Sequence, residues 1–380
     1  MRRTGFAELP LHNGHAPQWL VKRMIRLAEG IVTVLIDEFG RDAFLERISD
    51  PYWFQALGCV LGYDWHSSGV TTVATGVLKS AIDPEKLGVV VCGGKGKSSK
   101  NTLSELESVG EKFGLSSQEI FRLKYASRMS AKVDNAAVQD GYKLYHHAFF
   151  VIEDGSWAVV QQGMSLDDRT ARRYHWLSKN LESFVEEPHE AIVGDKRREI
   201  TLNMTAMESE GCRKASVDIA KERPWKIIKM LKSIRPAYQR SLQEWIRVDA
   251  DPEPKKSSMA YLYLPSTINW KTLERVYEFQ PSNYEDLLGI KGVGPATVRG
   301  LALIAELIYG ERPSWRDPVK YSFAYGGKDG VPFPVDRGAM DESIQVLREC
   351  IEIARLGNKE KLSSLRRLMR FAPPSRKVDY

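Results

Sequence analysis

The segment from Asn283 to Gly310 constrains the fold most, because two apolar helical patterns meet there at a short glycine turn. Apolar residues recur every three or four positions on either side of the turn, which is the periodicity of an amphipathic helix. The turn reads Lys291-Gly292-Val293-Gly294, and Pro295 follows at a position suited to the first turn of a helix. We therefore expect two helices joined by a tight turn, with free backbone N–H groups at the start of the second.

Free N–H groups at a helix N-terminus attract anions, and the two glycines can take positive φ and allow a close backbone approach. The run from Leu288 to Thr297 closely resembles the helix-hairpin-helix element of DNA-binding proteins, whose turn holds backbone phosphate without reading bases. The resemblance implies phosphate contact at Lys291, Gly292, Val293, Gly294, Ala296 and Thr297. The alternative is an ordinary pair of helices with a glycine turn packed as core.

Length and composition indicate a globular protein of two or three domains. No apolar run is long enough to cross a bilayer, and the four cysteines form no CxxC pair, so we expect a cytoplasmic protein with reduced thiols, no membrane partner and no thiolate metal site. The net charge of +6 is mild, and its local distribution says more about partners.

The pattern of elements predicts an α+β protein that is mostly α. Two β-rich runs, 148–152 and 157–161, flank Asp154-Gly155 and predict a β-hairpin, while 87–92 reads as a buried strand. The domains we expect are an α/β front domain with a small sheet over 1–195, a helical connector over 196–258 and a helical domain with the glycine turn over 259–380. Helices are expected at 17–39, 41–48, 52–61, 73–81, 103–129 with a break near Phe113-Gly114, 134–145, 212–222, 224–233, 236–248, 269–278, 284–288, 295–310, 341–355 and 359–370.

Two further basic stretches are candidates for phosphate contact. The predicted strand 87–92 leads into a glycine-rich loop with Lys95 and Lys97, an order that can hold phosphate, although the spacing is not that of a Walker A motif. Arg172 and Arg173 precede three aromatic rings, a mixture that suits phosphate contact with base stacking. The alternatives are a mobile basic loop for the first stretch and an amphipathic helix with a snorkelling arginine for the second.

The order of motifs along the chain resembles the uncharacterised prokaryotic family catalogued as domain of unknown function 763. The matching stretches are LPLHNG, DPYWFQALG, YDWHSSGVTTV, CGGKGK, FFVIEDGSWAVVQQGM, RRYHW and YGGKDGVPFPVD. The resemblance implies no settled activity. It implies that a basic α/β front part and a helix-hairpin-helix occur together.

Catalytic candidates in the front half are Asp64, His66, His147 and Gln161, which lie in polar stretches at the ends of predicted elements. A metal-dependent nuclease would need clustered carboxylates to hold Mg²⁺. The usual nuclease hairpin ends in Glu-x-Lys, and Val160-Gln161-Gln162 stands at that place. Glutamine is a poor replacement for a charged ligand, which weakens that match. His146 and His147 are neighbours on a strand and should point to opposite faces, so both cannot easily bind one metal.

Asp336 is a catalytic candidate in the back half. Pro334-Val335-Asp336 is similar to the Pro-Val-Asp of helix-hairpin-helix DNA glycosylases, in which the aspartate stabilises positive charge on the sugar or activates the nucleophile. Ala296 stands where lyase-active members carry lysine, so the resemblance allows only a monofunctional glycosylase. The alternative is that Asp336 caps the following helix.

The sequence thus predicts a protein of DNA repair or processing that binds DNA independently of base sequence. RNA as an alternative partner and the oligomeric state are left open. One alternative is a DNA-processing enzyme, either the Mg²⁺-dependent nuclease or the glycosylase. The other is an enzyme acting on small phosphorylated molecules, with the glycine turn as a protein contact.

Overall fold

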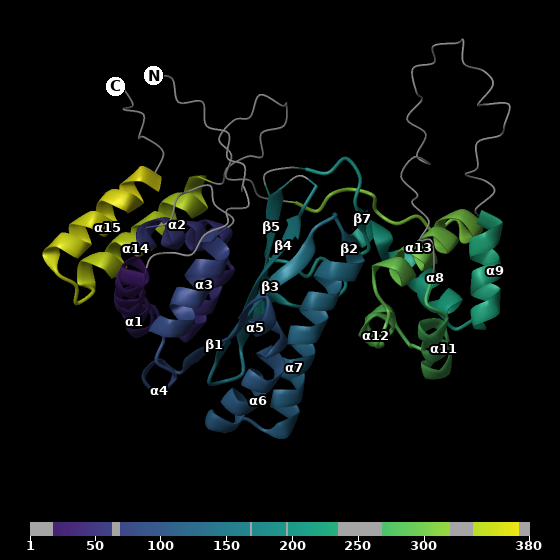
Figure 1. Ribbon diagram of the computed structural model, residues 1–380, viewed down its shortest axis with the longest axis horizontal. Helices are drawn as coiled ribbons and strands as arrows, with labels where there is room; N and C mark the ends of the chain where they lie inside the picture. Colours follow the sequence, from purple (N-terminus) through teal and green to yellow (C-terminus); the bar gives the residue numbers. More distant parts are fainter. Residues whose placement is uncertain are drawn as a thin grey trace, which may run out of the picture.

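A computed structural model describes residues 18–62, 69–167, 169–194, 197–234, 268–319 and 337–371. Its centre is an antiparallel five-stranded sheet in the order β1-β3-β4-β5-β6 (Figure 1). A separate antiparallel pair joins β2 to β7. The strands are β1 (Val89–Lys95), β2 (Val138–Gln139), β3 (Lys143–Ile152), β4 (Trp157–Ser165), β5 (Thr170–Leu177), β6 (Ala191–Val193) and β7 (Leu202–Asn203).

Helices make up most of the rest, so the predicted class, mostly helical α+β with a small sheet, is confirmed. The helices are α1 (Gln18–Ser49), α2 (Pro51–Leu61), α3 (Gly69–Ala81), α4 (Pro84–Leu87), α5 (Lys97–Lys100), α6 (Thr102–Lys112), α7 (Ser117–Lys132), η1 (Val133–Ala137), η2 (Ser178–Asn180), η3 (Met207–Ser209), α8 (Glu210–Ala220), α9 (Pro224–Ile234), α11 (Trp270–Phe279), α12 (Tyr284–Gly289), α13 (Pro295–Tyr309), α14 (Arg337–Ile353) and α15 (Asn358–Phe371).

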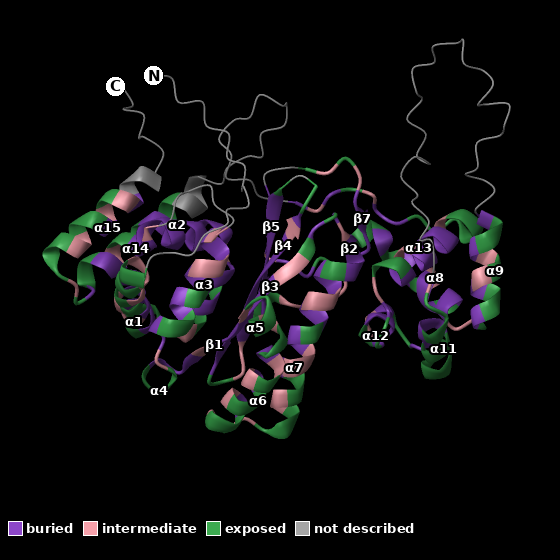
Figure 2. Ribbon diagram, viewed as in Figure 1, coloured by how far each residue is buried: buried purple, intermediate pink, exposed green. Residues whose placement is uncertain are grey.

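The sheet is buried on both faces, and each face has its own hydrophobic core (Figure 2). Successive side chains of a strand point to opposite faces. Phe150 and Ile152 of β3 therefore join a core with α1, α2, α3, α14 and α15, whereas Phe149 and Val151 join a core with α6 to α9 and α11 to α13. This alternation also decides which helix layer each polar residue of the sheet meets.

The predicted β-hairpin is confirmed. Phe149 pairs with Val159 and Val151 with Trp157, so β3 and β4 have the expected antiparallel register. At the tip, the Asp154 carboxylate accepts a hydrogen bond of 2.7 Å from the Ser156 amide, and Gly155 has a φ of 85°. Both features close the turn with the residues that the sequence had singled out.

The helix predicted over 134–145 is wrong. The structure has a π-helical turn over Val133–Ala137, then β2, and β3 begins at Lys143. Asp134 explains the break, because its fully buried carboxylate is bonded to side chains of β4, β5 and the segment before β6. These tertiary contacts fix the chain there against the local helical preference. The helix considered for 172–176 is also wrong, because those residues lie in β5.

The two cores cross the predicted domain boundaries. Helices α14 and α15, expected to belong with the glycine turn, pack instead against α1 and α2 on the opposite side of the sheet (Figure 1). Helices α8 and α9, expected in a connector, pack against α13 in the second core. The predicted helix 236–248 lies outside the described residues.

Candidate functional site

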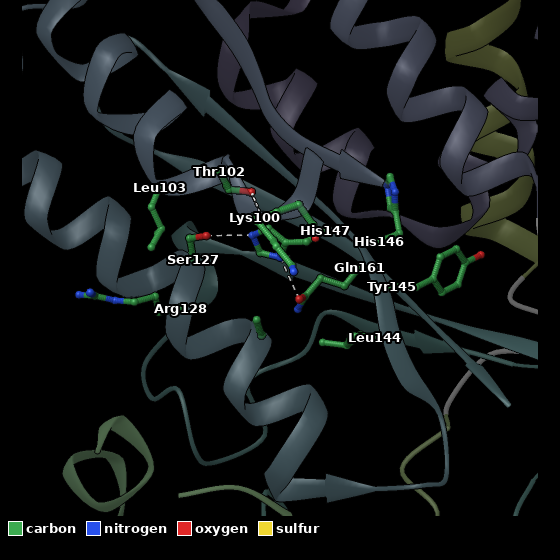
Figure 3. Close-up of a pocket in the computed structure, with 12 residues that line it drawn as sticks. Lys100, Thr102, Leu103, Ser127, Arg128, Leu144, Tyr145, His146, His147 and Gln161 are labelled. Carbon is green, nitrogen blue, oxygen red and sulfur yellow. Dashed lines mark hydrogen bonds between the residues drawn. The ribbon is translucent and has the colours of Figure 1, made fainter. Parts of the chain in front are cut away.

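A cavity of about 390 Å³ opens between α5, α6, α7 and the ends of β3 and β4. Figure 3 shows that the predicted residues His147 and Gln161 lie together in it and that α7 contributes Ser127. The residues that line it are Ser99, Lys100, Thr102, Leu103, Ser127, Arg128, Ala131, Leu144, Tyr145, His146, His147 and Gln161.

A chain of hydrogen bonds starts at Ser127 and runs into the protein. The Ser127 hydroxyl is 2.9 Å from Nε2 of His147, and Nδ1 of His147 is 2.8 Å from Oε1 of Gln161 (Figure 3). The side chain of Gln161 then donates from Nε2 to Oδ2 of Asp134 over 2.6 Å. Four side chains from α7, β3, β4 and η1 are thus connected in series.

Asp134 fixes the direction of every bond in this chain. Its Oδ2 also accepts from Trp176 at 3.1 Å, and an indole N–H can only donate, so Oδ2 acts as an acceptor. Gln161 accordingly has its NH₂ toward Asp134 and its carbonyl oxygen toward His147. His147 then carries its proton on Nδ1, and its bare Nε2 accepts the hydroxyl proton of Ser127.

Burial keeps the His147 ring uncharged. It lowers the pKa of His147 from 6.5 to about 4, although the hydrogen bond to Gln161 acts in the opposite direction. Burial raises the pKa of Asp134, whose other oxygen, Oδ1, lies 2.5 Å from Nε2 of His189. The cavity therefore holds a neutral imidazole with a free lone pair that is aimed at a hydroxyl group.

His146 does not belong to this chain. Its Nε2 is 3.0 Å from the hydroxyl of Thr75 in α3, on the opposite face of the sheet from Ser127. Burial lowers its pKa from 6.5 to about 3. The prediction that the two adjacent histidines point to opposite faces is confirmed.

The predicted basic loop lies beside the cavity. Gly93 and Gly94 continue β1 along β3, and a Cβ at Gly93 would meet the His147 carbonyl oxygen at 2.3 Å, so only glycine fits there. Lys95 and Lys97 are exposed, and Lys100 from the following short helix lines the cavity. The loop thus carries positive charge to the rim of the cavity.

Four carbonyl groups at the glycine turn between α12 and α13 accept hydrogen bonds from side chains of neighbouring elements. Lys132 of α7 donates to the carbonyls of Ile290 and Val293. Arg275 of α11 donates to the Lys291 carbonyl at 3.2 Å, and Gln139 donates to the Pro295 carbonyl at 2.9 Å. Side chains of α7, α11 and β2 therefore fix the turn by donating hydrogen bonds to its carbonyl groups.

The amide groups of the same turn differ from its carbonyl groups in their hydrogen bonding. Across the described part of the chain, the amides of Gly292, Gly294 and Ala296 have no protein acceptor. Lys291, Gly292 and Ala296 are exposed and Gly294 is half-buried, whereas Val293 and Thr297 are buried and support the turn from within.

Only one of the two glycines needs its special conformation. Gly292 has a φ of 102° and is the third residue of a turn closed by the Val293 amide on the Ile290 carbonyl at 3.2 Å. A Cβ there would lie 2.6 Å from Oγ1 of Thr272. Gly294 has a φ of −149°, which any residue adopts, so Gly294 does not use the positive φ that glycine allows.

Arg172 and Arg173 lie in the interior and are not available for phosphate contact. Both are buried in β5, and Arg172 forms ion pairs of 2.9 Å with Asp140 and 2.8 Å with Asp317. Burial alone would lower the pKa of Arg172, but these two carboxylates raise it. Arg173 on the opposite face donates to His175 at 2.8 Å. Neither guanidinium reaches a surface where a phosphate could bind it.

The candidates Asp64, His66 and Asp336 lie outside the described residues. The sequence analysis did not single out Ser127, Asp134 and His189. For Ser127 a signal existed, because it shares the buried face of α7 with Leu123 and Ala126, where a serine interrupts an apolar stripe. Within the described ranges, no group of three or more His, Cys, Asp or Glu side chains is arranged to hold a metal ion.

Comparison with known proteins gives a family and no named function. Within the described residues, no helix has the length and apolar character needed to cross a membrane. No curated protein and no solved structure matches the chain. A family model described as a protein of unknown function (DUF763) matches residues 5–335, and the chain therefore belongs to this family.

Proposed function

We propose that the protein binds the phosphate backbone of DNA, independently of base sequence, through the turn from Lys291 to Ala296. One observation carries the proposal: the carbonyls of Ile290, Lys291, Val293 and Pro295 accept hydrogen bonds from side chains, while the amides of Gly292, Gly294 and Ala296 have no acceptor among the described residues. Unpaired N–H groups at the start of a helix favour an anion.

The surroundings of the turn support an anionic ligand. Lys291 at its tip and Arg275 beside it are exposed cations, and Lys132 lies behind it. Burial lowers the pKa of Lys132. Helix α13 is 15 residues long and starts at Pro295, so its dipole points toward the same place. Contact through backbone amides carries no information about bases, which is why binding would be independent of sequence.

The experiment is a titration of a fluorescent DNA duplex against the full chain, followed by anisotropy at several salt concentrations. The logarithm of the association constant should fall linearly with the logarithm of the salt concentration, with a slope of about −0.9 for each phosphate neutralised. Lys291→Glu should weaken binding roughly tenfold at low salt and make that slope shallower by about one.

Lys112→Glu is the matched control, because Lys112 is exposed at the far end of α6 and the charge change is the same. Equal losses in the two variants would mean that only net charge matters, and the proposal would fail. A single-stranded RNA of the same length, titrated in parallel, tests the alternative partner.

A further inference from the structure

The cavity beside α7 holds a serine in contact with an unprotonated imidazole nitrogen. Ser127 is 4 % exposed and lines the cavity, and the hydrogen bonds behind it leave Nε2 of His147 as the acceptor of its hydroxyl proton. A serine hydroxyl becomes a nucleophile when an adjacent base can take its proton. The base in turn needs a group that holds its ring, and Gln161 does this through its hydrogen bond to Nδ1 of His147.

The series of hydrogen bonds continues beyond His147 and Gln161 to Asp134, although orienting Ser127 alone would not require so many groups. Asp134 accepts from Gln161 and Trp176 and lies 2.5 Å from Nε2 of His189, so a buried carboxylate polarises the amide of Gln161, which bonds the imidazole. When the imidazole takes up a proton, Gln161 presents a carbonyl oxygen to the Nδ1–H group and stabilises the positive ring. Asp134 and Gln161 are positioning residues in this arrangement, because they act through His147.

The lining of the cavity indicates the charge of its ligand. Lys100 and Arg128 are exposed cations that line it, and no carboxylate is among its described lining residues. A volume of about 390 Å³ is many times that of a water molecule, which occupies about 30 Å³. The two cations can pair with the oxygen atoms of a phosphoester.

We propose that Ser127 is the nucleophile of a phosphoester-cleaving site in this cavity, with His147 as its general base. The oxygen Oγ of Ser127 forms a bond to phosphorus, and its proton moves to Nε2 of His147. The bond from phosphorus to the ester oxygen breaks, and that oxygen leaves with the proton from His147. Water then attacks the phosphoserine, gives its proton to His147, and Ser127 recovers a proton as the phosphate departs.

This activity goes beyond the proposed DNA binding and does not depend on it. The ester could come from a polynucleotide or from a small phosphorylated molecule, because both present the same phosphorus. Helix α7 carries Ser127 and Arg128 at the cavity and Lys132 at the glycine turn, about one and a half helical turns further on. A DNA strand held at the turn would therefore pass close to the cavity.

The test uses diisopropyl fluorophosphate, which phosphorylates an activated serine with loss of fluoride. The full chain is incubated with the reagent, and intact mass and peptide mapping count and locate the adducts. We expect one adduct, on Ser127. Mapping on the unsubstituted protein needs no variant to fold, and either no adduct or an adduct on another residue overturns the proposal.

Two variants test the chemistry. Ser104→Ala removes an exposed serine of α6 that is not among the lining residues of the cavity and whose hydroxyl donates to the Asn101 carbonyl, so labelling should be unchanged. His147→Gln should slow labelling by about a hundredfold or more, which is the contribution of a general base. Labelling is compared at temperatures where urea unfolding shows both variants folded, and an unchanged rate in His147→Gln overturns the role of His147.

Turnover then separates the two sources of ester. Release of 4-nitrophenolate from 4-nitrophenyl phosphate favours a small monoester, whereas cleavage of bis(4-nitrophenyl) phosphate and of a labelled oligonucleotide favours a polynucleotide. Lys291→Glu should leave labelling of Ser127 intact even where DNA binding is lost. Failure of the proposed function and failure of the serine site are thus observed separately.

Discussion

Two basic regions that look alike in the sequence have opposite environments in the structure. Arg172 in β5 is buried between two carboxylates, whereas Lys291 at the glycine turn is exposed, with unpaired amides beside it. The difference comes from Asp140 and Asp317, which lie far apart in the sequence and meet only in the fold. A basic residue is available to a phosphate when the fold brings no acid to it.

The largest effect is expected when Arg172, the buried one of these two cations, is replaced. Arg172→Met leaves Asp140 and Asp317 without their counter-charge in the interior, and we expect a loss of about 3–5 kcal/mol in the free energy of unfolding. Lys291→Met is the control on the exposed side and should change stability by no more than about 0.5 kcal/mol. Urea unfolding measures both. Similar losses in the two variants would contradict the contrast between the buried, paired Arg172 and the exposed Lys291.

The second effect concerns acid. Burial lowers the pKa of His146 from 6.5 to about 3, so at pH 5 the unfolded chain binds a proton there that the folded chain does not. Stability due to this residue is therefore lost as the pH decreases from about 6.5 toward 3. Linkage gives a loss of about 2 kcal/mol between pH 7 and pH 5.

His146→Gln tests this sign directly. The unfolding free energy of the variant should depend less on pH than that of the unsubstituted protein, by about 2 kcal/mol over this range. Other buried groups, including His147 and Asp134, contribute equally to both proteins and cancel in the comparison. Identical pH dependence would show that His146 is not kept neutral by burial.

The smallest effect sharpens the description of the turn. Gly292→Ala should cost about 1–3 kcal/mol, because the φ of 102° strains any other residue and the new Cβ would crowd Thr272. Gly294→Ala should cost less, because Gly294 has an extended φ and nothing closer than 3.9 Å to an added Cβ. Urea unfolding ranks the two variants, and the reverse order would contradict the geometry of the turn.

Local patterns predicted most elements because they rest on neighbours in the chain. The hairpin at Asp154-Gly155 and the turn before Pro295 are set by residues within a few positions of each other. The end of α7 could not be predicted in this way. It depends on Asp134 meeting Gln161 and His189, and no local pattern shows that such a carboxylate will be buried.

The candidate site divides in the same manner. His147 and Gln161 were identified from polar residues on predicted strands, and the register of β3 and β4 places them opposite each other. Ser127 lies on a helix 20 residues earlier and joins them only through tertiary packing. The packing of α14 and α15 against α1 and α2 is equally non-local, which is why the predicted domain boundaries do not follow the two cores.

The most direct test of DNA-backbone binding at the glycine turn observes the amides themselves. Amide chemical shifts of the isotope-labelled chain are recorded as a DNA duplex is added at low salt and again after salt is raised. We expect the Gly292, Gly294 and Ala296 resonances to move on addition of DNA and to return when salt releases it. If DNA binds while these three resonances stay in place, the glycine turn is not the site of contact.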